Sequence, residues 1–343
     1  MKKVTMQDIA DYLNLSKNSV SQALRGKGGV SLETQSLIVK TAAEMGYHYN
    51  KPQTEVNHPS RSFVFLASDY TLSSGLLNRS FFSNIYISIE QEISHRGWQL
   101  LLLPINRGQI DTLTLPACLY EQEIDGMILL SHLSNPYIDK LIETGIPMVV
   151  IDHHYPGMNA DAVLTNNRFG AYQIVEHLIE LGHTEIGFMG NEDVSPSYQE
   201  RFEGYLLAFR TANLNLPDKK WMFRDIIEKD KEVYARLEAL DKQPTAWFCV
   251  NDGLCYYTFS YLQQKGYEIP KDISLCCYDN GDLSRLTQPK ITTMDIPLSY
   301  YGSRAFEQLL WRIENPDVPY QEILLPSILL KRASTHYNIQ NQI

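Results

Sequence analysis

Residues 5–26, TMQDIADYLNLSKNSVSQALRG, contain two short helical patterns separated by a break. In each pattern apolar residues recur every three or four positions, which is the spacing of one helix face. These residues are Met6, Ile9, Ala10 and Leu13 in the first pattern and Val20, Ala23 and Leu24 in the second. Thr5 followed by Asp8 has the form of a capping box, and Ser16 can cap the second helix. The stretch therefore predicts two helices joined by a tight turn.

The second of these helices turns polar side chains outward, namely Lys17, Asn18, Ser21 and Gln22. Two amides and an ammonium at the start of a two-turn helix have no evident use in solvent. A helix that reads DNA presents such groups to base edges in the major groove. We therefore predict DNA contacts here. The alternative is a helical hairpin that only packs against a neighbour.

A third helix is predicted from Val30-Ser31-Leu32-Glu33-Thr34 through Ala43, with Ser31 as its cap. It would close a three-helix core with Leu37, Ile38, Thr41 and Met45, and Tyr47 would pack on that core. Residues 1–49 are thus expected to be a small all-α domain.

The charge of the chain is divided unevenly between this domain and the rest. The net charge is −10, yet residues 1–61 hold eight Lys/Arg against five Asp/Glu, giving +3. The remaining residues hold 22 against 35, giving −13. An acidic body repels phosphate, so DNA contact must be confined to the small basic N-terminal part.

The N-terminal residues resemble the LacI/GalR family of bacterial transcription regulators. The matching residues are Val4-Thr5, Asp8-Ile9-Ala10, Leu15-Ser16, Ser19-Val20-Ser21, Leu24, Gly26, Val30-Ser31, Glu33-Thr34 and Gly46-Tyr47. The resemblance implies a sequence-specific DNA-binding regulator, a repressor, that binds double-stranded operator DNA. With the outward side chains it gives these candidate DNA contacts: Thr5, Ser16, Lys17, Asn18, Ser19, Ser21, Gln22, Arg25, Val30, Asn50 and Val56.

Residues 50–61, NKPQTEVNHPSR, are predicted to be a hinge or linker, because they contain Pro52 and Pro59 and no apolar periodicity. In the family this stretch becomes a short hinge helix in the minor groove, where a leucine from each subunit wedges between base pairs. Here Tyr49 replaces a usual proline, Pro52 falls inside the expected helix, and Val56 stands near the leucine position. We therefore expect Val56 to intercalate shallowly or not at all.

From Phe63 onward, apolar strand patterns alternate with helical patterns, which predicts α/β structure with parallel sheets covered on both faces. The expected strands are 63–67, 99–103, 127–130, 147–151, 186–189, 246–250 and 273–277, with helices at 82–96, 170–181 and 252–265. About 270 residues exceed one comfortable hydrophobic core, so two lobes are expected.

The family resemblance continues through this body, in segments such as Val150-Ile151-Asp152, Leu181-Gly182-His183 and Asn251-Asp252. It implies a periplasmic-binding-protein-like fold over residues 62–343, in which the chain crosses between lobes more than once. We expect one lobe from 62–161 with 292–320 and the other from 162–291 with 321–343. The tail after Thr335 lacks a leucine heptad, so a homodimer is expected and a tetramer is not.

A small-molecule site is predicted between the lobes, because ligands bind beyond the carboxyl ends of strands in open α/β sheets. Asp152, Asn251 and Asp279 each follow a predicted strand, and Arg201 lies about one turn into the helix after Gly190. Relatives hold their ligand at these positions. The alternative for the strand-end residues, Asp252 included, is helix capping. Tyr70, Phe81 and Phe82 could stack on a ligand or belong to the core. Carboxylates, an amide and a guanidinium suit a polyhydroxylated effector, a sugar or sugar derivative, with a nucleobase as the alternative.

Other chemistry finds little support. No catalytic triad, phosphate loop or activated cysteine has recognisable spacing, so we expect neither an enzyme nor a cofactor. The five cysteines lack metal-ligand spacing, and His153-His154 is interpreted as a solvated loop rather than a metal site. No apolar run reaches the ~20 residues of a membrane span, and Met1-Lys2-Lys3 leads into a helix rather than a signal region. A cytoplasmic protein is expected, not a transporter's binding protein.

Overall fold

The computed structural model describes residues 4–25, 30–45, 47, 61–69, 79–130 and 133–338. The chain divides into two compact units, Met1–Pro59 and Ser60–Ile343. The division falls inside the segment 50–61, in which we expected a linker. Asn50, Val56 and Tyr70, three of the predicted contact residues, lie outside the described residues.

The first unit contains the three expected helices, α1 (Met6–Leu13), α2 (Lys17–Arg25) and α3 (Leu32–Glu44). The capping box at the start of α1 is present, because the Asp8 N–H donates to Thr5 Oγ1 at 3.3 Å and the Thr5 N–H donates to Asp8 Oδ2 at 2.7 Å. Ser16 and Ser31 cap α2 and α3 by accepting from the N–H three residues on, at 3.0 and 3.2 Å. These caps satisfy N–H groups that the first turn of a helix leaves unpaired.

A small apolar core holds the three helices together. Its buried members are Ile9, Ala10, Val20, Ala23, Ile38 and Ala42. Tyr47 packs against this core, as predicted. Leu37, which we expected inside it, is 51% exposed. Leu37 lies about 100° around the helix from Ile38, and α3 turns the Ile38 face inward.

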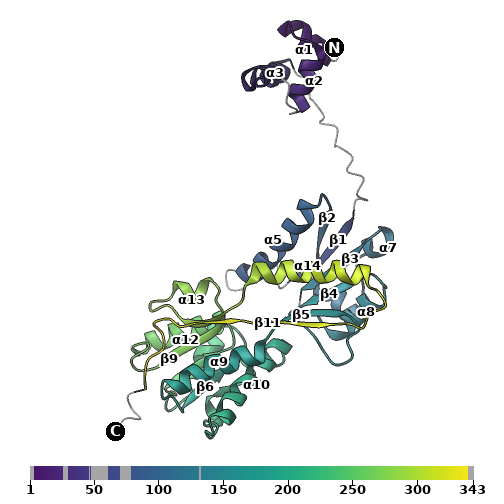
Figure 1. Ribbon diagram of the computed structural model, residues 1–343. Helices are drawn as coiled ribbons and strands as arrows, with labels where there is room; N and C mark the ends of the chain where they lie inside the picture. The colour runs from purple at the N-terminus through teal and green to yellow at the C-terminus, as the bar shows by residue number, and fades with distance from the viewer. Residues whose placement is uncertain are drawn as a thin grey trace. The chain divides into compact units, whose positions relative to one another are not determined.

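The second unit is built on two six-stranded sheets (Figure 1). The first has the order β11-β5-β4-β3-β1-β2, formed by β1 (Ser62–Ser68), β2 (Gln99–Ile105), β3 (Gly126–Leu130), β4 (Met148–Ile151), β5 (Asp161–Thr165) and β11 (Glu322–Leu325). The second has the order β12-β10-β9-β8-β6-β7, formed by β6 (Ile186–Met189), β7 (Met222–Phe223), β8 (Ala246–Cys249), β9 (Ser274–Asp279), β10 (Thr292–Asp295) and β12 (Ile328–Leu330). The paired strands are parallel except β12, which runs antiparallel to β10. The predicted α/β body with parallel sheets is confirmed.

Helices cover these sheets on both faces. Those before β6 are α5 (Arg79–His95), α6 (Arg107–Thr112), α7 (Cys118–Glu121), α8 (Asn135–Ile142) and α9 (Asn167–Glu180). Later come α10 (Pro196–Thr211), η1 (Lys219–Trp221), α11 (Asp230–Glu238), α12 (Asp252–Gln264), α13 (Asp282–Leu286) and α14 (Leu298–Glu314). In β1, Phe63 and Phe65 enter one apolar core while Val64 and Leu66 enter another, because successive strand residues face opposite sides. In the described part of the chain no helix is long and apolar enough to cross a membrane.

The chain crosses between the two sheets three times, after β5, after β10 and after β11. These positions differ from the expected lobe boundaries. β5 and β11 belong to the first sheet and β10 to the second, whereas we placed 292–320 with the first lobe and 321–343 with the second. Four-residue strands such as β10 and β11 carry little periodic signal, and their pairing partners lie far away in sequence.

A buried ion pair fixes the segment that returns from α14 to β11. Arg312 Nη2 and Nε donate to the two carboxylate oxygens of Asp161 at 2.8 and 2.9 Å, and both side chains are at most 5% exposed. Arg312 Nη1 also donates to the carbonyl of Val318 at 2.6 Å, and the Gln321 N–H donates to Asp161 at 2.7 Å. The pair thus ties the start of β5 to the connection preceding β11.

Candidate functional site: a DNA-reading helix and an interlobe cleft

The predicted DNA-contact residues that the structure describes lie on or near α2. Lys17 and Asn18 are exposed in its first turn, and Ser21 and Gln22 are partly exposed one turn later. The hydroxyls of Ser16 and Ser19 lie 2.8 Å apart at the cap, and Thr5 caps α1. Val30 packs against the apolar core of the first unit and is partly buried. Arg25 is the last residue of α2, and its side chain is outside the described part. Helix α2 therefore presents hydrogen-bonding groups on one surface.

In the second unit, a cavity of about 440 Å³ lies between the two lobes. Its walls come from segments that follow strands, which is where ligands bind in α/β folds. From the first lobe, after β3 and β4, come Leu133, Ser134 and His153. From the second come Asn191, Val194, Tyr198, residues 226–229 and Leu254.

Arg201 anchors a buried polar cluster beside this cavity. It lies in the second turn of α10 and is 2% exposed. Its Nη1 lies 3.0 Å from Asp279 Oδ1 and donates to the carbonyl of Val250 at 2.5 Å, and its Nε donates to Asn167 Oδ1 at 2.9 Å. The ring of Tyr278 lies 3.8 Å from the guanidinium carbon. The fold thus brings Arg201 and Asp279 together, as the sequence suggested.

Asn251 joins this cluster to the wall of the cavity. Its Oδ1 caps α12 by accepting from the Leu254 N–H at 2.9 Å. Its Nδ2 donates to the Tyr198 hydroxyl at 2.7 Å and to Glu228 Oε2 at 2.6 Å. Capping and site-forming were posed as alternatives for this residue, and the structure shows that it caps while bonding two cavity-lining side chains.

Asp152 connects the lobes directly. It follows β4 of the first sheet, and its Oδ1 accepts from the hydroxyl of Ser197 in α10 at 2.7 Å. Asp152 and Asp279 both have a positive backbone φ, 57° and 91°, a region that residues other than glycine seldom occupy. Such backbone outliers concentrate at ligand-binding and switching sites.

Burial dominates the electrostatics of the carboxylates here. It raises the pKa of Asp152 and of Asp279, while the charge of Arg201 opposes the rise at both. Burial, followed by the charge of Asp279, raises the pKa of Asp252 to about 7. Asp252 lies in the first turn of α12, where Cys277 Sγ contacts its Oδ1 at 3.1 Å. The cluster therefore gathers three carboxyl groups near one guanidinium, and burial favours their neutral forms.

Two predicted aromatic residues lie elsewhere. Phe81 and Phe82 are on α5, with ring centroids 5.1 Å apart, and neither lines the cavity. Phe82 is buried in the main apolar core and Phe81 packs against it. The alternative we left open for them, core residues, is the one that the structure supports.

Sequence reasoning missed three residues of the cleft. Ser197 and Tyr198 precede Arg201 by four and three positions on the same helix. Residues at this spacing share one helix face, so the spacing from Arg201 was a signal that could have found them. Glu228 lies between β7 and α11, in a segment without a periodic pattern. No sequence signal pointed to it.

His153 and His154 were interpreted as a solvated loop, but His153 is buried and His154, which is 25% exposed, is engaged by two carboxylates. His153 is buried, and its Nε2 lies 2.9 Å from Asn135 Oδ1. His154 bridges Glu200 of α10 and Glu322 of β11 at 3.2 and 3.1 Å. Hydrogen bonding to Glu200 raises the pKa of His154 to about 9, although burial opposes the rise. Burial alone would raise the pKa of Glu200, but the bond and charge of His154 outweigh it and lower that pKa.

This bridge predicts a pH-dependent stability. Because the folded pKa of His154 is raised from 6.5 to about 9, its contribution is complete below pH 6.5 and is lost as pH rises through about 9. We expect His154→Gln to cost about 1–2 kcal/mol at pH 6, a discounted value because Glu322 is 56% exposed. Melting temperatures at pH 6 to 10 measure it, with exposed His95→Gln as the control. A wild-type-to-variant difference that stays constant with pH contradicts the charged bridge.

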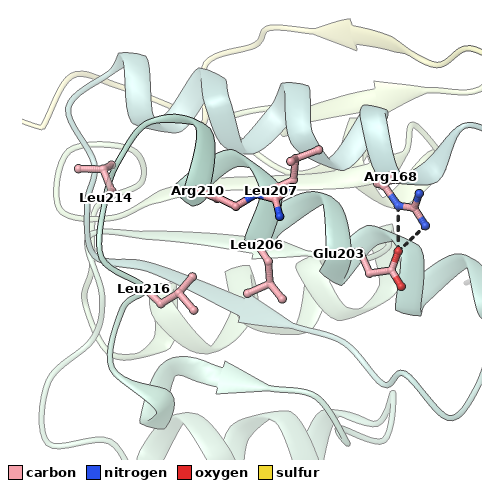
Figure 2. A pocket seen from close by; sticks show the side chains of 7 residues that line it. All are labelled: Arg168, Glu203, Leu206, Leu207, Arg210, Leu214 and Leu216. Carbon is pink, nitrogen blue, oxygen red and sulfur yellow. Dashed lines mark hydrogen bonds and ion pairs between the residues drawn. The ribbon is translucent and has the colours of Figure 1, made fainter.

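A larger hollow, of about 640 Å³, lies on the second lobe alone (Figure 2). Leucines of α10 and of the following loop form it, beside the ion pair of Arg168 with Glu203. None of the predicted site residues lines it. None of the predicted ligand residues that the structure describes lines the interlobe cavity either. That cavity is the candidate ligand site because two of its lining residues, Tyr198 and Glu228, accept hydrogen bonds from Asn251.

In the ranges the structure describes, no group of three His, Cys, Asp or Glu residues is arranged to hold a metal ion. All five cysteines are free thiols, four of them buried.

The fold and the cleft define a two-lobed ligand-binding body linked in one chain to a helix-turn-helix module. Residues 5–50 match the model of the bacterial regulatory proteins of the lacI family, and residues 175–335 match that of a periplasmic binding protein-like domain. The chain is 31% identical to the HTH-type transcriptional repressor PurR of Vibrio cholerae serotype O1 (strain M66-2), covering 91% of this chain and 92% of that protein. It is 28% identical to the ribose operon repressor of Haemophilus influenzae, covering 97% and 98%. A solved lacI-family regulator from Enterococcus faecium with bound ribose matches with a TM-score of 0.68 and 27% identity, over 81% of this chain and all of that one.

The chain therefore belongs to the lacI family of bacterial regulatory proteins and is a DNA-binding transcriptional regulator. This confirms the resemblance inferred from residues 4–47.

Proposed function

We propose that this protein is a cytoplasmic repressor that binds operator DNA as a homodimer and responds to a small-molecule effector, a sugar or sugar derivative. The observation that carries the proposal is the polar cluster around Arg201, which adjoins an interlobe cavity and includes a hydrogen bond between the lobes from Ser197 to Asp152. A ligand that closes or opens the lobes changes such contacts, which couples the cavity to the rest of the body.

The chemistry of the cavity supports a sugar. Hydroxyl, amide and carboxylate groups of Ser134, Asn191, Tyr198 and Glu228 stand beside the apolar side chains of Val194, Ile226 and Leu254. A pyranose or furanose ring offers hydroxyls at its edge and C–H groups on its faces, and so matches a wall of this mixed kind. The ribose operon repressor and the ribose-bound regulator from Enterococcus faecium point in the same direction.

The small size of the N-terminal three-helix domain supports a homodimer. One α2 helix reads only a few base pairs, and two heads spaced about one helical turn apart, ~34 Å, read a palindromic operator. The basic charge of residues 1–61 supplies the phosphate contacts, while the acidic remainder is repelled by DNA.

Two measurements test the proposal. A gel shift with genomic fragments, followed by footprinting, must reveal a specific palindromic site. A melting-temperature screen of sugars and nucleobases must yield a compound that changes the affinity for that site. Absence of specific DNA binding, or a retained site that no stabilising compound affects, contradicts the proposal.

Gln22 is predicted to set the half-site preference. Arginine is common in the family at this position and favours guanine, whereas glutamine favours adenine. We expect Gln22→Arg to change the preferred half-site at a cost of about 1–3 kcal/mol for the original sequence. Selection of sites from a random pool measures the change. Gln7→Arg, on the exposed surface of α1, adds the same charge and should leave the preferred sequence unaltered. Identical selected half-sites for Gln22→Arg and the wild type rule out this role.

A further inference from the structure

Glu228 occupies a fixed position at the wall of the cavity. The segment that carries it is tied to the strand end after β6, since the Ile226 N–H donates to the Gly190 carbonyl at 3.1 Å and Asn191 Nδ2 donates to the Ile226 carbonyl at 3.4 Å. On its other side, a Cβ added at Gly253 would collide with Glu228 Oε1, so the carboxylate lies directly against the start of α12. Neighbouring backbone thus holds the side chain at the cavity.

Hydrogen bonding fixes the role of this carboxylate as an acceptor. Asn251 Oδ1 is committed to the cap of α12, so its Nδ2 group faces Glu228 and Tyr198. The amide nitrogen has two hydrogens, and these two contacts use both of them. Glu228 Oε2 therefore receives a hydrogen bond, and because a carboxylate offers about four lone-pair sites, it retains acceptor capacity for a ligand in the cavity that Glu228 lines.

The charges around Glu228 are unbalanced. Burial and the nearby charge of Asp279 raise the pKa of Glu228, and the Asn251 hydrogen bond opposes the rise. The buried cation of the cluster, Arg201, is already engaged by Asp279, by the Val250 carbonyl and by Asn167. Lys229 also lines the cavity but is exposed. Among the residues that the structure describes, an anionic ligand in the cavity would therefore meet the Glu228 carboxylate, and Arg201, the buried cation nearby, is already engaged.

We propose that Glu228 is the specificity-determining residue of the effector cleft: it accepts hydrogen bonds from ligand hydroxyls and excludes phosphorylated and carboxylated sugars. The inference rests on the proposed function, because it concerns the same cleft. It adds the ligand's charge class, an uncharged polyol. A carboxylate is suited to this task because it keeps lone pairs that can accept from a ligand hydroxyl after it has accepted from Asn251, and its negative charge repels phosphate.

The test uses the full-length protein and matched pairs of probes. Ribose, glucose, galactose and fructose are compared with ribose 5-phosphate, glucose 6-phosphate, galacturonate and fructose 1-phosphate, by melting temperature and then by calorimetric titration. In the wild type we expect at least one neutral sugar to bind and its charged partner to bind about tenfold more weakly or worse, since like charges are brought together. Glu228→Gln keeps the size of the side chain and the contact with Asn251 but removes the charge.

In Glu228→Gln we expect the neutral sugar to bind about 3–30-fold more weakly than it binds the wild type. We also expect the gap in affinity, which is the ratio of the neutral sugar's affinity to that of its charged partner, to fall about fivefold or more. Asp230→Asn removes a charge two residues away that does not line the cavity, and it should leave the gap unchanged. A charged sugar that binds the wild type as tightly as its neutral partner overturns the inference. So does a gap that Glu228→Gln leaves unaltered.

Failure of the inference can be told apart from failure of the proposed function. A sugar phosphate that binds and changes operator affinity overturns the role of Glu228 and leaves a ligand-controlled repressor standing. If no sugar of either class raises the melting temperature or binds in the titration, both the charge class and the sugar effector are overturned.

Discussion

Replacing Arg312 by alanine is expected to lower the free energy of unfolding of the body by about 3–5 kcal/mol. Arg312 and Asp161 form a two-point ion pair in which the carboxylate is 0% exposed. Removing the cation leaves a buried charge without its partner, which costs far more than the pair itself contributes. The carbonyls of Val318 and Pro319, which accept from the same guanidinium, lose their donor as well.

Urea unfolding followed by tryptophan fluorescence measures this loss, and circular dichroism tests whether a single transition is involved. Arg304→Ala is the matched control, because Arg304 lies on the same helix and its ion pair with the exposed Glu307 spans 3.6 Å. We expect that control to cost under about 1 kcal/mol. If Arg312→Ala costs no more than Arg304→Ala, the buried pair does not hold the returning segment in place.

The elements that sequence reasoning predicted are those with a local cause. The caps at Thr5, Ser16 and Ser31 involve side chains and N–H groups three residues apart, so a short stretch contains all the information. Strands such as β3 and β8 consist entirely of buried residues and read as apolar runs. Chain length predicted the two lobes, and the family resemblance added the periplasmic-binding-protein-like fold in which the chain crosses between them; no local pattern contains either.

What sequence reasoning did not predict depends on partners far apart in the chain. Asp161 and Arg312 are separated by 151 positions, and no local sequence pattern around either residue indicates that the two form a pair. β10 and β11 were assigned to the wrong lobes because a four-residue strand does not indicate which sheet it joins. His154 looked solvated because Glu200 and Glu322, which bury and charge it, come from two other elements.

The candidate site shows the same division. Asp152, Asn251 and Asp279 were proposed because each ends or follows a strand, and the strand-end rule needs only the strand. Arg201 came from the resemblance, and the structure adds that its guanidinium is buried beneath Tyr278. Glu228 could not be found in this way, because it becomes a site residue only through its contact with Asn251.

Asp279→Asn is expected to abolish the effect of the ligand on operator affinity while leaving ligand-free operator binding within about threefold of the wild type. Coupling between two sites in proteins is typically worth about 1–3 kcal/mol, or 5–150-fold in affinity, and that is the change expected of the wild type. Asp279 pairs with Arg201, whose helix also carries Ser197, the donor to Asp152 of the other lobe. A ligand that shifts this cluster would therefore also change a contact between the lobes. The DNA contacts are assigned to the first unit and these residues to the second, so binding without ligand should persist.

Arg201→Ala should lose the response as well, but it leaves Asp279 and Asp152 buried beside no cation and will also lower the melting temperature. Asp279→Asn keeps the shape of the side chain and is the cleaner variant. Asp282→Asn, three residues on and exposed, removes the same charge outside the cluster and should respond normally. Operator affinity is measured for each protein with and without the compound that stabilises the wild type. A full ligand response in Asp279→Asn would place the effector site elsewhere. Loss of DNA binding by this variant at the wild-type melting temperature would refute the assignment of DNA binding to the first unit and effector binding to the second. Because the ion pair, the interlobe bond and the cavity wall meet on one helix, α10, we expect the response alone to be lost.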